Sequence, residues 1–113
     1  MALFTELPLY KDCYDLLLKV YTLSKNFHRD TRYTIGEGLK KEIFELVLLL
    51  YRANMASSKG EYLGVAREKI EVVRLMIRLL KDLKQIPLTP FVSLNELVEK
   101  ISKQLLAWQR KSS

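Results

Sequence analysis

The sequence predicts an all-α fold, an antiparallel up-down four-helix bundle formed by one domain over residues 1–113. Apolar residues recur three and four positions apart in four segments, which is the spacing of one helix face. No segment alternates apolar and polar residues as a half-buried strand does. The connections between the segments are short, and short connections place consecutive helices antiparallel.

The first helix is expected over residues 8–26. Pro8 suits the first turn, where a missing N–H costs nothing. Its predicted core stripe consists of Leu9, Cys13, Leu16, Val20, Leu23 and Phe27. We therefore expect Cys13 to be a small buried hydrophobic residue. A single cysteine forms no disulfide within the chain, which favours a cytoplasmic location.

The other three helices are expected over residues 35–55, 61–86 and 90–110. Thr34 with Glu37, and Ser58 with Glu61, have the spacing of a capping box at a helix start. The helix over 35–55 is apolar nearly all round, which predicts burial on most faces. The next helix should end before Pro87, because a residue that precedes proline avoids the α conformation. The last helix then opens with Thr89 as N-cap and Pro90 in the first turn.

The helix over 61–86 carries more apolar surface than a small monomer needs. Its core seam is Leu63, Ala66, Ile70, Val73, Ile77 and Leu80. A second apolar set lies beside it, at Val65, Val72, Leu75, Met76, Leu79, Leu83 and Ile86. Closed symmetry is the common way to hide such repeated patches, so we expect a closed homo-oligomer. The predicted interface residues are Val72, Leu75, Met76, Leu79, Tyr14 and Tyr21.

The charge balance is strongly basic. The formal net charge is +6 at pH 7 and the pI is about 9.5, which favours an acidic partner such as DNA or RNA. The predicted binding residues are Arg29, Arg32, Lys40, Lys41, Arg67, Arg74, Arg78 and Lys81. The alternative is a solvated helix face with local pairs, such as Glu71 near Arg74.

Nothing in the sequence predicts catalysis. The chain has one histidine and one cysteine, fifteen positions apart, and neither phosphate-binding glycine motif occurs. We therefore expect no enzyme activity, no catalytic residues, no metal site and no cofactor. The longest apolar run, Leu46–Tyr51, is far below the ~20 residues of a membrane span, and the N-terminus lacks the features of a secretory signal. No membrane partner is expected.

Several short segments together resemble a known family. They are Tyr10–Leu18, Phe27–Glu37, Tyr51–Asn54, Ala66–Arg74 and Ile101–Leu105. They are similar to the accessory variability determinant (Avd) of diversity-generating retroelements. They are also similar to the broader four-helix bundle family encoded in intervening sequences of bacterial 23S ribosomal RNA genes. Two positions depart from the family pattern, which has proline in place of His28 and a polar or charged residue in place of Gly38.

The resemblance implies a homopentameric barrel of four-helix bundles with a basic surface. It also implies binding of DNA or RNA and of the element's reverse transcriptase, in support of mutagenic retrohoming. The basic positions that match the family are Arg29, Arg32, Arg67, Arg74 and Arg78. Two alternatives stay open: a ribosomal-RNA intervening-sequence bundle without a reverse transcriptase, and a protein-interaction scaffold with an acidic partner.

Overall fold

The computed structural model describes residues 3–112, which contain four long helices and no strand. This confirms the prediction of an all-α helical bundle. In chain order the elements are η1 (Phe4–Glu6), α1 (Pro8–Ser24), α2 (Arg29–Thr31), η2 (Arg32–Gly36), α3 (Glu37–Met55), α4 (Gly60–Asp82) and α5 (Leu88–Ser112). Among the described residues, no helix is long and apolar enough to cross a membrane.

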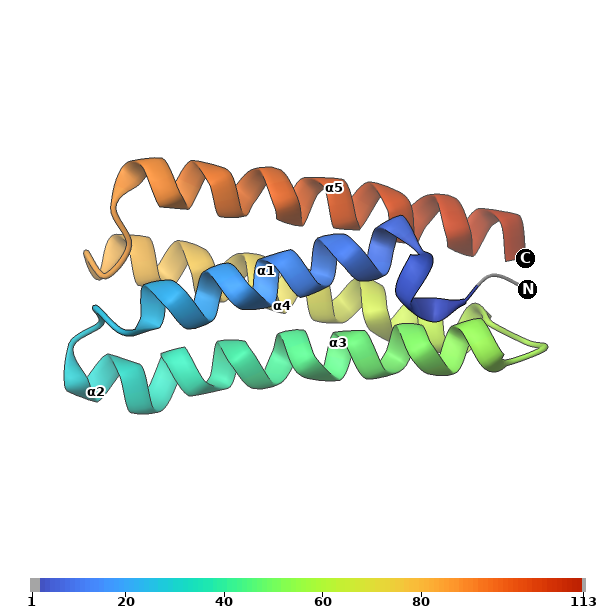
Figure 1. The fold of residues 1–113 in the computed structure, drawn as a ribbon, viewed down its shortest axis with the longest axis horizontal. Helices are drawn as coiled ribbons and strands as arrows, with labels where there is room; N and C mark the ends of the chain where they lie inside the picture. The colour runs from blue at the N-terminus through green and yellow to red at the C-terminus, as the bar shows by residue number, and fades with distance from the viewer. Residues whose placement is uncertain (1–2, 113) are drawn as a thin grey trace.

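The four long helices pack side by side in an elongated molecule of 43 × 22 × 22 Å. Helix α1 packs against α3 and α5, and α4 packs against the same two helices. Figure 1 shows each long helix running back along the one before it. The loops after α1 and after α4 therefore lie together at one end, on the left of the view.

The core sits where the apolar spacing predicts it. Buried residues occupy one stripe of each long helix, at Leu9, Cys13, Leu16 and Val20; Leu39, Ile43, Leu46, Leu50 and Ala53; Leu63, Ala66, Ile70, Val73, Ile77 and Leu80; and Leu94, Val98, Ile101 and Leu105. Pro8 is the first residue of α1, as predicted. Burial raises the pKa of the Cys13 thiol to about 12, which agrees with its reading as a core residue.

The expectation that α3 is buried on most faces is wrong for the single chain. Phe44, Leu48 and Tyr51 are exposed by 57%, 38% and 49%. Helix α3 has only α1 and α4 as long-helix neighbours, so its outer side lacks a cover. The single chain thus leaves apolar surface uncovered along α3.

The capping box predicted at Thr34 is also wrong. The helical backbone starts at Arg29, six residues earlier, and continues through the π-helical segment η2 into α3. Thr34 Oγ1 donates a hydrogen bond of 2.6 Å to the carbonyl of Asp30, one turn back in the same helix. A threonine inside a helix makes this bond, whereas an N-cap would accept one from an N–H further along.

The capping box predicted at Ser58 does not form, and a lysine side chain makes the hydrogen bonds at this turn instead. Helix α4 begins at Gly60 with no side-chain cap. Instead, Lys59 Nζ donates to the carbonyls of Ala53 (2.8 Å) and Ala56 (2.6 Å), at the end of α3. The last carbonyls of a helix lack partners within it, and a cation there also complements the helix dipole. The lysine therefore holds the end of α3.

Two further boundaries differ from the prediction. Helix α5 begins at Leu88, so Thr89 lies inside it and is not the N-cap. Helix α4 ends at Asp82, four residues early, because Lys84 adopts a left-handed φ of 62°. The Gln85 N–H then bonds the Leu80 carbonyl (2.9 Å), which is the Schellman way of ending a helix. Glycine is the usual residue at this position, so a lysine there does not predict the end of a helix.

Candidate nucleic-acid interface

The eight predicted basic residues fall on separate surfaces. Arg29 and Arg32 lie at the bundle end that holds the two loops. Lys40 and Lys41 lie in the first turns of α3. Arg67, Arg74, Arg78 and Lys81 follow α4 on the side that faces α5. The residues therefore do not form one continuous patch in a single chain.

At the bundle end, a hydrogen bond between the two loops gathers the cations. The backbone N–H of His28 donates to Gln85 Oε1 at 2.7 Å, and Gln85 Nε2 donates to the Leu83 carbonyl at 3.0 Å. Gln85 thus ties the loop after α1 to the loop after α4. His28 itself is exposed, as expected of a loop histidine.

Four cations occupy this end, and we call them the basic end: Lys25, Arg29, Arg32 and Lys84. Arg32 is half-buried; its Nη2 donates 2.7 Å to the Lys25 carbonyl, and its buried Nε has no partner. Lys25, Arg29 and Lys84 are exposed. Arg32 therefore also supports the structure, while the other three present charge to solvent.

The basic strip on α4 is largely compensated by its neighbours. Arg74 pairs with Glu71 at 3.1 Å and with Glu99 of α5. Arg78 pairs with Asp82 at 3.2 Å. These acids reduce the positive field along the strip, since opposite charges a few ångströms apart cancel at a distance.

The remaining two strip residues are also engaged. Arg67 Nη1 donates to Gln109 Oε1 at 2.7 Å, and Lys81 Nζ lies 5.0 Å from the centroid of the Phe91 ring. Of the strip, Arg74 and Arg78 line a groove between α4 and α5, together with Glu71, Leu75, Phe91, Asn95 and Glu99. The groove therefore contains acidic, basic and apolar side chains and is not a purely cationic surface.

Lys40 and Lys41 are adjacent in the sequence but differ in solvent exposure. The Lys40 side chain is only 12% exposed; its Nζ lies 4.3 Å from the centroid of the Tyr21 ring and 3.8 Å from Glu37 Oε1. Lys41 is exposed. Lys40 therefore helps to join α3 to α1, and only Lys41 presents its charge fully to solvent.

Comparison with protein families agrees with the resemblance seen in the sequence. The model of the bAvd-like family matches residues 8–112, which is nearly the whole chain. The chain belongs to the bAvd-like family. Comparison with curated proteins finds none that matches it.

In this bAvd-like chain, the family-like segment Phe27–Glu37 forms the basic end. Phe27 is buried (3% exposed) and lies against Gly36, where an added Cβ would come within 3.3 Å of its ring. Arg32 binds the loop after α1 from the same segment. The segment therefore closes the end of the core and carries two of the basic-end cations.

All but one of the predicted interface residues of the bAvd-like chain lie on two faces, one on each side of α3. Leu75 is the most exposed of them at 67%, Val72 and Leu79 are exposed, and Met76 is partly buried. Met76 lies next to α3, since a Cβ at Gly38 would touch its Cε, and Val72 and Leu79 share its side of α4. Leu75 instead lines the groove between α4 and α5. Tyr14 and Tyr21 are about half exposed on α1, where Lys40 of α3 reaches Tyr21.

The face between α3 and α4 also holds an ion-pair cluster that the sequence analysis did not predict. Lys69 Nζ lies 2.9 Å from Glu42 Oε2 and 2.6 Å from Glu45 Oε1. The hydrogen bond from Lys69 lowers the pKa of Glu45, and the bonds to both glutamates raise the pKa of Lys69. Glu45 and Lys69 therefore stay charged around neutral pH, and the cluster joins α3 to α4.

Lys25 and Lys84 of the basic end are not among the binding residues predicted from the sequence. The two lysines are far apart in sequence, and only the His28–Gln85 bond shows that their loops meet. Within residues 3–112, no group of histidine, cysteine or acidic residues is arranged to hold a metal ion.

Proposed function

We propose that this bAvd-like chain is a non-enzymatic, cytoplasmic accessory protein of a diversity-generating retroelement. It binds DNA or RNA through backbone phosphates, and it binds the element's reverse transcriptase to support mutagenic retrohoming. Membership of the bAvd-like family is the observation that carries this proposal. The net charge of +6 supports the nucleic-acid part.

The nucleic acid contacts the basic end first. Lys25, Arg29 and Lys84 are exposed there, and one acid, Asp30 of α2, directly follows Arg29. The α4 strip contributes less in the single chain because Arg74 and Arg78 bind carboxylates. Phosphate contacts of this kind carry no sequence information, so binding is largely independent of sequence.

The chain assembles into a closed homo-oligomer, a pentamer by family resemblance. Two different apolar faces flank α3, one with Val72 and Leu79 and the other with Tyr14 and Tyr21. A head-to-tail contact joins two different faces and closes into a ring when the rotation fits. A ring repeats each basic end once per subunit, which raises the local attraction for a polyanion.

Two triple variants with equal charge test where the nucleic acid binds. One carries Lys25→Glu, Arg29→Glu and Lys84→Glu; the other carries Arg67→Glu, Arg74→Glu and Arg78→Glu. Three reversals of two units each take the formal net charge from +6 to zero in both. In filter binding with duplex DNA, we expect the first variant to lose most affinity and the second to lose clearly less. For each tenfold increase in salt concentration, the wild-type binding constant should fall by about 0.9 logarithmic units per phosphate contact.

The same two variants test the partner protein. The reverse transcriptase encoded beside the gene is co-purified with each of them and with wild type, and complementary-DNA yield is measured. We expect wild type to recover the enzyme and the basic-end variant to recover less, with circular dichroism confirming that each variant is folded. Affinity that does not change with salt would refute the nucleic-acid part. Failure of wild type to recover the enzyme would refute the partner.

A further inference from the structure

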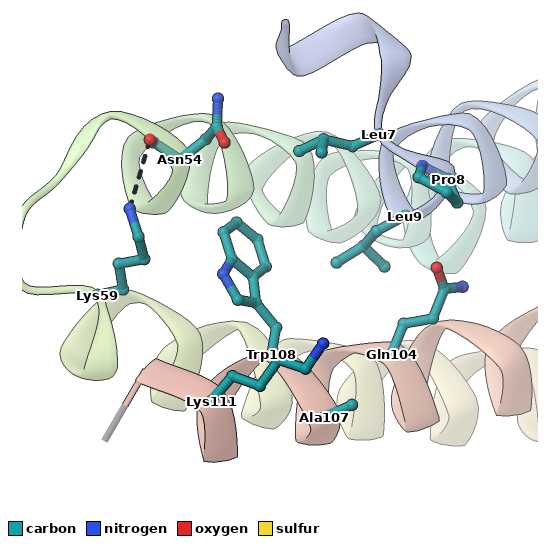
Figure 2. Close-up of a pocket in the computed structure, with 9 residues that line it drawn as sticks. All are labelled: Leu7, Pro8, Leu9, Asn54, Lys59, Gln104, Ala107, Trp108 and Lys111. Carbon is teal, nitrogen blue, oxygen red and sulfur yellow. Dashed lines mark hydrogen bonds between the residues drawn. The ribbon is translucent and has the colours of Figure 1, made fainter. Parts of the chain in front are cut away.

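A pocket opens at the end of the bundle opposite the basic end, where α1 begins and α3 and α5 end (Figure 2). Its volume is about 470 Å³, within the range of small-ligand sites. Leu7 and Leu9 form apolar wall on the α1 side, and the indole of Trp108 projects into the space between α5 and α3. Trp108 is the only tryptophan in the chain.

Some polar groups of the pocket already have hydrogen-bond partners, and others do not. Lys59 Nζ is occupied by the carbonyls at the end of α3, one of which is the dashed contact to Asn54 in Figure 2. Among residues 3–112, the side-chain amide of Asn54, the indole N–H of Trp108 and the ammonium of Lys111 have no hydrogen-bond or ion-pair partner. Of the described residues, two lysines and no aspartate or glutamate line the pocket.

We propose that this pocket binds one unpaired nucleobase of a single-stranded nucleic acid, stacked on Trp108 with its phosphate on Lys111. The inference rests on the proposed function, and it adds a single-strand site to the charge contacts of the basic end. A base has apolar faces and a polar edge, so it matches an indole beside aliphatic walls and the Asn54 amide. The phosphate supplies the negative charge that the unpaired ammonium of Lys111 favours, since Lys59 Nζ is already bound to the carbonyls at the end of α3.

The stacking proposal differs physically from charge binding alone. A duplex keeps its bases stacked inside, so it reaches the basic end but cannot place a base on Trp108. Single strands gain the stacking contact, which is sequence-tolerant because every base has a π-face. The protein should therefore prefer single-stranded oligonucleotides over duplexes of equal length, although the duplex carries twice as many phosphates.

Trp108 provides a direct readout, because every change in tryptophan fluorescence reports on the pocket. Wild-type protein is titrated with a thymidine 20-mer and with a duplex of equal length, and total binding is measured in parallel by the anisotropy of a labelled strand. We expect saturable quenching by the single strand and little change with the duplex. Lys111→Glu should weaken single-strand binding by at least about fivefold, and Ala107→Phe, which places a ring at an exposed position on the pocket wall, should abolish the quenching.

Lys103→Glu is the matched control, because it makes the same charge change at an exposed position of α5 outside the pocket. It should leave the quenching intact and weaken binding less than Lys111→Glu. Binding by anisotropy without any quenching would overturn the pocket site and leave the proposed function standing. Equal effects of the two lysine variants would also overturn it. No binding of either oligonucleotide would overturn the inference and the nucleic-acid proposal together.

Discussion

At the residue scale, small groups decide how closely the elements approach. Gly36 and Gly38 both have helical surroundings, but they have different neighbours. A Cβ at Gly36 would lie 3.2 Å from the Thr31 carbonyl oxygen and 3.3 Å from the buried ring of Phe27. A Cβ at Gly38 would meet only the terminal methyl of Met76, at 2.9 Å. The first contact is with fixed atoms and the second with a flexible side chain.

Alanine substitutions at these two glycines should therefore change stability in opposite directions. Gly38→Ala should stabilise by about 0.5–1 kcal/mol, because alanine is the better helix former and Met76 can turn aside. Gly36→Ala should destabilise by about 1 kcal/mol, because overpacking against Phe27 exceeds the same helical gain. Urea denaturation at one protein concentration measures both variants. Destabilisation by both, or by neither, would contradict this account of the two sites.

At the element scale, the ends of the helices are set by contacts that differ from the expected ones. Lys59 closes α3 by hydrogen bonds to its last carbonyls, although its place in the chain is just before α4. Helix α4 ends through the left-handed Lys84 without a glycine. In a non-glycine residue this conformation costs roughly 1–2 kcal/mol. The end of α4 therefore holds strain that one substitution can remove.

Lys84→Gly should raise stability by about 1 kcal/mol, which corresponds to a melting temperature higher by roughly 4–8 °C. Lys84→Ala is the control, because it removes the same charge but keeps the Cβ that the left-handed conformation disfavours. Thermal melting followed by circular dichroism should rank glycine above both alanine and lysine. If alanine matches glycine, the gain comes from the lost charge and the backbone explanation is incorrect.

At the scale of the whole molecule, exposed apolar surface is the feature that most needs an explanation. Phe44, Leu48 and Tyr51 lie along α3, with Val72 and its neighbours on one side and the α1 tyrosines on the other. Exposed apolar patches of this extent are typical of protein–protein contacts. The basic end and the Trp108 pocket lie at opposite ends of the bundle, away from the middle of these faces.

A double substitution should separate the predicted oligomer from the fold. Val72→Glu with Leu79→Glu places charge on an exposed apolar face and should give a smaller species that remains helical. Leu88→Glu with Val92→Glu is the control, because these α5 residues are also exposed, by 66% and 45%, but lie outside both faces. Light scattering coupled to size-exclusion chromatography measures the mass. A monomeric wild type at micromolar concentration, or equal dissociation in both variants, would refute the predicted interface.

The helical class, the core stripes and the basic charge balance of this protein follow from its residues alone. Each of these is a local property: the spacing of Leu63, Ala66 and Ile70 buries one side of a helix wherever that helix packs. The resemblance in Phe27–Glu37 also pointed to the family that the comparison confirmed. The same local reasoning misplaced the helix starts, because a capping box is a spacing that a continuous helix can also contain.

The contacts of charged residues between different helices depend on how the helices pack. The spacing indicates only the local pair of Arg74 with Glu71, and the second pair, with Glu99, depends on the position of α5. Lys25 and Lys84 are far apart in sequence and come together through the bond between His28 and Gln85. The Trp108 pocket likewise needs residues from α1, α3 and α5 at one end of the bundle. Such pairings depend on how helices distant in sequence are placed in space, and the period of a single helix carries no information about that placement.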